Sequence, residues 1–523
     1  MLQYGRENNG MRKGWTLHLD QHQGSQLRNY LRSQMSLWTL FKLIKTVGTF
    51  KVGLSAICIV SVGARAECCG FSVNGPIASG VILLMIWIVL LSLSGNSALP
   101  GGTIFGLLII SYSAFLGGKL LEFIKIPLMP PLPPLLGMLL AGFVVRNIPF
   151  ISEHVTIPST WSSALRNCAL TVILIHAGFG MDPQALKHLK GVCLRLSFGP
   201  CIIEACSAAV FSHYIMKFPW QWGFLLGFVL GAVSPAVVVP SMLLLQKNGF
   251  GIKEGIPTLL NAASSLDDIV AITGFNTFLS IVFASGTVIN HILSSLRDIC
   301  IGIVLGITMG FFVQHFPSGD QERHTLKRAF LVLSICVSVV LGSHHIGLHG
   351  SGGLCTLVMS FMAATKWAEE KDSIQNIISH AWSIFQPLLF GLVGSEVAVD
   401  SLESNSVGTC IATLILALCA RILATFALMS FAGFSFKEKI FIALAWIPKA
   451  TVQAVLSPLV LETARLSAPH LEFYSRDVMT MAFLAILITA PNGALLIGIL
   501  GPRMLKHSDT SKITMPMKSF EYH

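Results

Sequence analysis

The sequence predicts an all-α polytopic membrane protein, and three observations lead to this fold class. The 523 residues are 53% hydrophobic and only 11% charged, whereas soluble globular proteins carry about 25% charged residues. Apolar segments of about 20 residues recur along the chain, which is the length that a helix needs to cross a bilayer. The basic residues are concentrated between these segments. A soluble globular fold is therefore excluded.

About fourteen apolar segments are predicted to be transmembrane helices. They lie at residues 77–94, 103–124, 132–150, 163–181, 191–215, 220–246, 256–285, 294–316, 328–347, 351–365, 376–398, 407–433, 439–462 and 478–502. The region 36–63 is a weaker candidate because lysines interrupt it, and a helix along the cytoplasmic membrane surface is the alternative there. The chain thus divides into a cytoplasmic N-terminal arm at 1–75, a transmembrane region at 76–505 and a cytoplasmic tail at 506–523.

Loop charge predicts the orientation of these helices. The outer loops at 95–102, 286–293 and 348–350 contain no lysine or arginine. The alternate loops and their edges are basic, and they carry Lys119, Lys125, Lys187, Lys190, Lys247, Lys253, Arg323, Lys327, Arg328, Lys366, Lys371, Lys437 and Lys439. By the positive-inside rule, both termini are predicted to be cytoplasmic. These anchors also explain the net charge of +10, so membrane lipids are the expected partners and nucleic acid is not.

Two of the predicted membrane helices contain proline near mid-depth. Pro235 and Pro240 lie in the segment 220–246, and Pro448 lies in 439–462. Proline removes a backbone donor and frees carbonyl groups that hydrocarbon cannot satisfy. Interrupted helices in corresponding halves of a chain are typical of transporters with inverted repeats. Kinks that serve only packing are the alternative, but each of these helices contains or adjoins an intramembrane charge.

The strongest functional signal is the pair Asp267 and Asp268, inside an otherwise uncharged apolar segment. An ionised carboxylate at membrane depth costs several kcal/mol unless it is paired, hydrated or protonated. Adjacent residues are about 100° apart on a helix, so the two aspartates cannot share one environment. A cation can hold one of them ionised, while the other, beside a like charge, is driven towards its protonated form. Asp268 is predicted to carry the proton or cation, and Asp267 to be its charge-compensated neighbour.

Further ionisable residues lie within the predicted helices. Glu204, Arg421 and Lys449 are expected to balance the aspartates if all of them share one bundle interior. A Glu204–Arg421 pair that only locks two helices, and a Lys449 that extends to the membrane surface, are the structural alternatives. Glu396 is expected at the membrane interface, and His176 is interpreted as a buried histidine with hydrogen-bond partners rather than a pH sensor.

Ligands for a small cation can be named from the same segments. Hard alkali cations prefer oxygen ligands, as other hard cations do. The two carboxylates, carbonyl groups freed near Val233, and the carbonyl or hydroxyl oxygen of Ser264 can supply them. Competition between H⁺ and a cation for such a site is sufficient for antiport if the site opens alternately to the two sides. Twelve cysteines show no metal-ligand spacing, so no cofactor is expected beyond the transported Na⁺ or Li⁺ and H⁺.

The motifs around these residues resemble those of the animal NHA-type Na⁺/H⁺ antiporters, solute carrier family 9 subfamily B. The similar segments are Gly231–Ser241, Ser264–Gly274, Gln386–Gly394 and Ile447–Ala454. The resemblance covers about residues 75–505. Within the family, the chain resembles the sperm-associated member more than the widely expressed one.

This resemblance implies a homodimer with a dimerisation domain and a six-helix ion-transporting core, built around two crossed broken helices. It places ion ligation at Asp267 and Asp268, with oxygen from Val233 and Ser264, and makes Arg421 the cationic partner. It implies exchange of Na⁺ or Li⁺ for H⁺ by elevator-like alternating access, which regulates intracellular pH and sodium. The expected location is the plasma membrane, with the sperm flagellum suggested by the resemblance.

Other functions remain as alternatives. A transport-inactive homologue that acts as a scaffold or regulatory partner is one, and a Na⁺-coupled symporter of organic anions is another. An intramembrane aspartyl protease needs its aspartates on separate helices, commonly with a GxGD motif, which this sequence lacks; the protein is not expected to be an enzyme. The stoichiometry is also open, because the acidic pair favours two protons per cation and the family resemblance favours electroneutral exchange.

Overall fold

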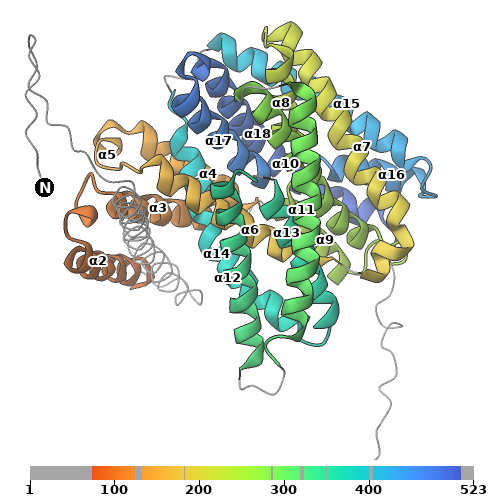
Figure 1. Ribbon diagram of the computed structural model, residues 1–523, viewed down its shortest axis with the longest axis horizontal. Helices are drawn as coiled ribbons and strands as arrows, with labels where there is room; N and C mark the ends of the chain where they lie inside the picture. The colour runs from red at the N-terminus through yellow and green to blue at the C-terminus, as the bar shows by residue number, and fades with distance from the viewer. Residues whose placement is uncertain are drawn as a thin grey trace, which may run out of the picture. The chain divides into compact units, whose positions relative to one another are not determined.

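The computed structural model describes residues 74–123, 132–181, 183–283, 287–318, 323–348, 350–399 and 404–507. Nearly all of the arm predicted at 1–75, with the candidate surface helix at 36–63, lies outside these residues, as does most of the tail at 506–523. The described residues form α-helices, two short 3-10 helices and loops, with one isolated bridge pair between Phe250 and His507 (Figure 1). The predicted all-α fold is confirmed.

Eleven helices in the described part of the chain are long and apolar enough to cross a membrane. The predicted count of fourteen is not confirmed, because three predicted segments form shorter helices. They are α4 (Pro134–Asn147), α13 (Ser351–Lys366) and the pair α16 (Phe436–Ala445) and α17 (Thr451–Ser467). In the last case the cause is local, since the break between α16 and α17 contains Pro448.

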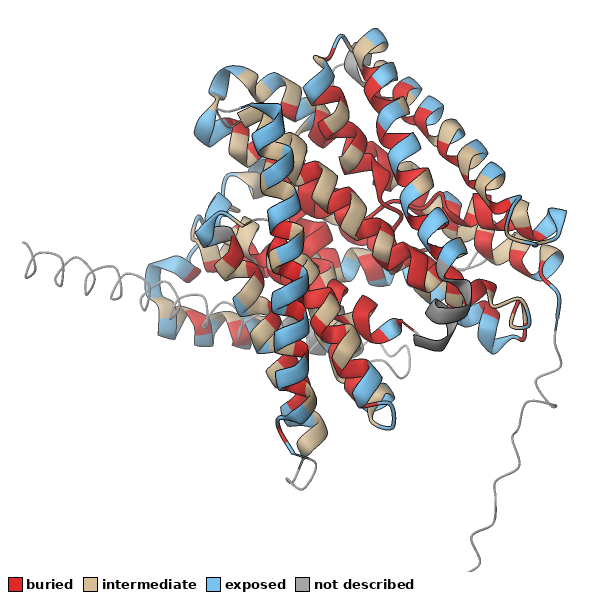
Figure 2. Cartoon of the chain, turned by 45° about the vertical axis from the view of Figure 1, so that its right-hand side comes forward, coloured by how far each residue is buried: buried red, intermediate tan, exposed pale blue. Residues whose placement is uncertain are grey.

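The other helices match the predicted segments closely. They are α2 (Asn74–Ser94), α3 (Thr103–Phe123), α6 (Ser159–Gly180), α7 (Pro183–Ile215), α8 (Trp220–Gly231), α9 (Pro235–Lys247), α10 (Ile256–Phe283), α11 (Val288–His315), α12 (His324–Ile346), α14 (Lys371–Glu396), α15 (Ser404–Met429) and α18 (Glu472–Met504), with the short elements η1 (Gly95–Ala98), α5 (Pro149–Ser152) and η3 (Pro469–Leu471). Exposed residues line the outward faces of the peripheral helices (Figure 2). Many are large and apolar, such as Val304 and Phe311 of α11, as expected where hydrocarbon replaces water.

The long helices pack in two groups. One group, which we call the core bundle, consists of α7, α8, α9, α10, α15, α16, α17 and α18. The other, the scaffold bundle, consists of α3, α4, α6, α11, α12, α13 and α14. The contacts between the bundles include those of α6 with α10 and α17, and of α14 with α17.

The core bundle contains the same sequence of elements twice. The helix α7, the interrupted pair α8–α9 and the long helix α10 are repeated as α15, the interrupted pair α16–α17 and α18. Four helices, α11 to α14, separate the two sets, so α15 starts on the side of the membrane opposite to α7. The two sets therefore have inverted orientations, as in many transporters.

Glycine allows the closest helix contacts of the scaffold bundle. A Cβ atom at Gly142 of α4 would lie 2.1 Å from the carbonyl oxygen of Gly391 in α14. On the other side of α4, a Cβ atom at Gly137 would lie 2.1 Å from the carbonyl oxygen of Gly117 in α3. Small residues of this kind let helix backbones touch in a membrane. They hold α3, α4 and α14 together.

Candidate ion-binding site

Two helix breaks meet inside the core bundle. The first, at residues 232–234, separates α8 from α9, and the second, at residues 446–450, separates α16 from α17. The backbone N–H of Ser234 donates a hydrogen bond to the carbonyl oxygen of Pro448 at 2.7 Å. The two breaks, one from each repeat, are therefore in direct contact.

The three prolines singled out in the sequence take different places around this crossing. Pro448 lies within the second break. Pro235 is the first residue of α9, where a missing N–H leaves no helical hydrogen bond unmade. Pro240 lies inside α9, away from the break, and lines a cavity described below. Pro235 and Pro448 thus lie at the crossing, and Pro235 also lines the cavity that Pro240 lines.

Asp267 of α10 is held by a cation and by the first break. It is fully buried, and its Oδ2 accepts a hydrogen bond from the backbone N–H of Val233 at 2.7 Å. The same oxygen lies 3.0 Å from Nη2 of Arg421. The carboxylate therefore replaces the carbonyl partner that the N–H of Val233 lacks at the break. Hydrogen bonds to a charged acceptor are among the stronger ones in proteins.

Glu204 of α7 joins the two buried cations. Nη1 of Arg421 lies 2.5 Å from its Oε2, and Nζ of Lys449 lies 2.7 Å from Oε1 and 2.8 Å from Oε2. All three side chains are fully buried. Lys449 therefore does not extend to the membrane surface. The structure brings Glu204, Arg421 and Lys449 together with Asp267 in one interior cluster, which we call the charge cluster.

The carbonyl groups freed at the first break are engaged by donors of the protein. Side-chain N–H groups donate hydrogen bonds to these carbonyl oxygens: Arg421 to that of Gly231, Lys449 to that of Leu230, and the Gln453 amide to those of Val229, Leu230 and Ala232. These carbonyl groups, just before Val233, thus stabilise two cations and an amide that the protein itself supplies. The expected ligation of a cation by oxygen at Val233 stays a prediction.

Asp268 has an environment unlike that of Asp267. It is fully buried, and neither of its carboxyl oxygens has a hydrogen-bond partner among the described residues. Other buried oxygens in the same condition are Oδ1 of Asp267, Oγ of Ser234, Oγ1 of Thr451 and Oε1 of Gln453. Buried polar groups are normally hydrogen-bonded, and oxygen is the ligand that hard cations prefer. Buried oxygens without partners among the described residues thus lie at both breaks and on α10, and they are of the kind that an alkali cation takes as ligands.

Ser264 lies one helical turn before Asp268 on α10. Its hydroxyl donates a hydrogen bond to the carbonyl oxygen of Asn261 at 2.9 Å. This bond uses only the proton of the hydroxyl, so the oxygen keeps acceptor capacity. Ser264 is thus placed beside Asp268 with an oxygen able to contact a cation.

Two supporting residues were not identified from the sequence. Thr489 of α18 accepts a hydrogen bond from the backbone N–H of Lys449 at 2.9 Å, so it supports the second break as Asp267 supports the first. A threonine in an apolar helix gives little signal, because its hydroxyl usually bonds its own backbone, as Thr489 also does to Ala485. Gln453 could have been found, since a neutral amide in an apolar segment needs partners.

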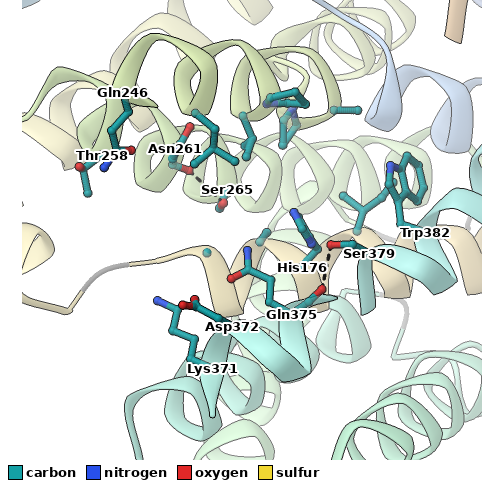
Figure 3. A pocket seen from close by; sticks show the side chains of 18 residues that line it. His176, Gln246, Thr258, Asn261, Ser265, Lys371, Asp372, Gln375, Ser379 and Trp382 are labelled. Atoms are coloured by element: carbon teal, nitrogen blue, oxygen red, sulfur yellow. Dashed lines mark hydrogen bonds between the residues drawn. The ribbon is translucent and has the colours of Figure 1, made fainter. Parts of the chain in front are cut away.

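A cavity of about 590 Å³ lies between the two bundles, at the ends of α6 and α9 and the start of α14. Loop charge predicts this end to be cytoplasmic, and we call the cavity the inner cavity (Figure 3). The wall formed by α10 carries Thr258, Asn261 and Ser265. These residues are three or four positions apart, as are Ser265 and Asp268, so all four share one helix face. Asp268 therefore lies one helical turn beyond the cavity lining, on the same face of α10.

At the opposite end, Arg166 of α6 joins the bundles. Its buried guanidinium forms an ion pair with Glu462 of α17 and also donates to Ser162. Glu396 of α14 lies further away, with its Oε1 3.9 Å from Nη1 of Arg166, and its side chain is 25% exposed. Arg166 was not singled out from the sequence, although it is a charge inside the predicted segment 163–181. It ties scaffold to core on the predicted outer side.

The family follows from a comparison with known families. A model described as sodium/hydrogen exchanger, transmembrane, matches residues 107–501. The chain belongs to the sodium/hydrogen exchanger family. The matched range contains both helix breaks, Asp268 and the charge cluster. The family is one of transporters in membranes, so the chain is a multi-pass membrane protein.

Similar proteins agree with this family. Sodium/hydrogen exchanger 9B1 of Homo sapiens is 69% identical over 451 residues, which cover 86% of this chain and 88% of that protein. Sodium/hydrogen exchanger 9B1 of Mus musculus is 72% identical over 447 residues, 86% of this chain and 79% of that protein. Sodium/hydrogen exchanger 9B2 of Homo sapiens is 57% identical over 431 residues, 82% of this chain and 80% of that protein. The subfamily inferred from the motifs is therefore confirmed.

A solved structure has the same fold. The sodium proton antiporter MjNhaP1 from Methanocaldococcus jannaschii at pH 8 matches with a TM-score of 0.59 and 20% identity. The match covers 81% of this chain and 99% of that chain. At this identity the likeness concerns the fold alone, and it assigns the chain an antiporter fold.

Proposed function

We propose that this protein exchanges Na⁺ or Li⁺ for H⁺ across the membrane, with Asp268 as the group that binds either the cation or the proton. The observation that carries the proposal is the isolation of Asp268. It is a buried carboxyl group without a hydrogen-bond partner among the described residues, beside a neighbour that is bound to Arg421. A carboxylate in this environment needs a bound cation or a proton. Family membership supports cation–proton exchange as the activity.

The charge cluster supports one proton per cation. Glu204 and Asp267 supply two negative charges, and Arg421 and Lys449 supply two positive charges. The cluster is thus neutral by itself, and the occupancy of Asp268 decides the net charge of the interior. A protonated Asp268 and an ionised Asp268 with a monovalent cation both give zero. Both loaded forms then cross the membrane at equal electrostatic cost, which favours electroneutral exchange.

Transport also requires access from alternate sides. The inner cavity opens one side of the contact between the bundles, while the Arg166–Glu462 ion pair closes the other. A rigid shift of the core bundle against the scaffold bundle would close the cavity and break this pair. We infer an elevator-like movement of this kind, since inverted repeats commonly move as units.

The assembly and location follow from the resemblance to the subfamily. We infer a homodimer joined through the scaffold bundle, in the plasma membrane, with both termini in the cytoplasm. The exchange would there regulate intracellular pH and sodium, and the sperm flagellum is the proposed site. Chemical cross-linking of the purified protein in nanodiscs tests the dimer, and antibody access to a tagged C-terminus tests the orientation.

Flux through proteoliposomes tests the exchange. We expect an imposed Na⁺ or Li⁺ gradient to drive proton movement in the wild type, and Asp268→Asn to abolish it while the protein remains folded. Asp298→Asn is the matched control, because Asp298 is a buried aspartate of the scaffold paired with Arg297 at 3.0 Å. Full activity of Asp268→Asn would refute the assignment. A wild type without any flux would favour the scaffold or regulatory role instead.

A further inference from the structure

His176 of α6 projects into the inner cavity with an unsatisfied ring nitrogen. Its Nδ1 is buried and has no hydrogen-bond partner among the residues that the structure describes. A buried histidine with hydrogen-bond partners was expected here from the sequence, and the structure departs from this at Nδ1. Figure 3 shows the imidazole pointing into the space between Ser265 and Trp382. The ring therefore faces the route to Asp268.

The groups that face His176 from the packed helices are mostly neutral. The walls formed by α9 and α10 contribute only uncharged side chains to the described lining of the cavity. Three further helices pack against α6, namely α12, α13 and α17, and no residue of theirs is in that lining. The charged residues of that lining are Lys371 and Asp372, at the start of α14. Lys371 donates to the carbonyl oxygen of Met181 at 3.2 Å, which holds it at the end of α6.

Deeper in the protein, the next ionisable groups are Asp268 and the charge cluster. Asp268 lies one turn beyond Ser265, and Ser265 is the last residue of α10 in the cavity lining. Among the described lining residues, His176 is therefore the ionisable group between the cavity mouth and the proposed binding site. A cation that enters this cavity therefore shares it with the His176 imidazole.

We propose that His176 controls cation entry through the inner cavity in response to pH. The proposal rests on the exchange at Asp268 and deepens it. The neutral imidazole offers a nitrogen lone pair or an N–H to the hydration shell of the entering cation. The imidazolium instead places a positive charge opposite the uncharged walls formed by α9 and α10, where it repels the entering cation. Histidine is the side chain whose charge changes between about pH 5 and 8.

Protons thus oppose the cation in two ways, by competition at Asp268 and by repulsion at His176. Each proton linked to cation binding changes the apparent KM by up to about tenfold per pH unit. The wild type should therefore show a KM for Na⁺ that rises more steeply than about tenfold per pH unit on the acidic side. Competition at Asp268 alone cannot give this steepness.

The apparent KM for Na⁺ on the cavity side of proteoliposomes, measured against pH, tests this expectation. His176→Gln should lower the slope to about tenfold per pH unit or less, while KM and Vmax at alkaline pH stay at the wild-type values. His176→Arg, a fixed cation, should raise KM at alkaline pH. His380→Gln is the matched control, because His380 of α14 is exposed, lies outside the cavity lining and contacts the carbonyl oxygen of Asn376 at 2.6 Å.

Two results would overturn the role of His176. One is a His176→Gln variant with the same slope as the wild type. The other is a loss of Vmax at every pH in that variant, which would make His176 a proton relay instead. Failure of the exchange proposal is distinguishable, because Asp268→Asn would then retain flux whatever the effect of changing His176.

Discussion

Replacing Glu204 with glutamine tests whether the buried charges form one balanced cluster. The Glu204 carboxylate lies 2.5 Å from Arg421 and 2.7 Å from Lys449. Two unit charges about 2.8 Å apart attract each other by about 6 kcal/mol at an effective dielectric constant of about 20, before desolvation is subtracted. Glutamine keeps the shape of the side chain and removes its charge. One buried cation is then left in excess, and breaking a buried pair in this way costs about 3–5 kcal/mol.

A second substitution restores the balance. Lys449→Met removes the excess cation that Glu204→Gln creates. By itself it should also destabilise the protein, because Arg421 is then the one cation left for the two carboxylates Glu204 and Asp267. We expect the double variant to be more stable than the sum of the two single effects by about 1–3 kcal/mol. Equilibrium unfolding of the purified protein in detergent, followed by tryptophan fluorescence, measures all three free energies of unfolding.

The control is a glutamate with two basic partners at the surface. Glu472 lies 3.1 Å from Arg465 and 3.0 Å from Arg476, and both arginines are about half exposed. Because exposed ion pairs contribute about 0–1 kcal/mol, Glu472→Gln should have a small effect. Effects of Glu204→Gln and Lys449→Met that add within about 0.5 kcal/mol would refute the reasoning, since they would mean that the two residues do not interact.

Two further predictions concern support of the site and packing of the scaffold. Thr489→Val leaves the backbone N–H of Lys449 without its acceptor, so the free energy of unfolding should fall by about 1–3 kcal/mol. Thr489→Ser keeps the hydroxyl and should keep the wild-type stability. Unfolding curves that coincide for the Thr489→Val and Thr489→Ser variants would contradict this. Gly142→Ala forces a methyl group against the carbonyl oxygen of Gly391 and should reduce the yield of folded protein on size-exclusion chromatography. Gly342→Ala is the control and should leave the yield unchanged, because the space around Gly342 is open. Equal yields for the two variants would argue against the close contact.

The sequence was most informative where the membrane imposes a strict constraint. Hydrocarbon cannot satisfy backbone groups or charges, so apolar segments predicted the helices and buried charges predicted the site. The charges Glu204, Arg421 and Lys449 were named for this reason, and the structure places them with Asp267. The helical offset predicted that Asp267 and Asp268 differ.

Other features depend on tertiary structure and could not be predicted from the sequence. The offset alone does not say which aspartate meets Arg421; Asp267 was named as the compensated one, and the structure pairs it with Arg421. The predicted count of fourteen membrane-spanning segments is not confirmed, since apolar composition does not report how long a helix is within its segment, as α4 and α13 show. The partner of Thr489 is 40 residues away along the chain. The role of Gln453 appears only when its amide reaches the first break.

On the proposed exchange, Asp268 gives up one proton for each cation that binds. Proton release from the purified protein in weakly buffered solution, on addition of NaCl or LiCl and with the bound cation counted, tests this directly. We expect one proton per cation for the wild type, no release for Asp268→Asn and none with choline chloride. Two protons per cation, or undiminished release from Asp268→Asn, would contradict it.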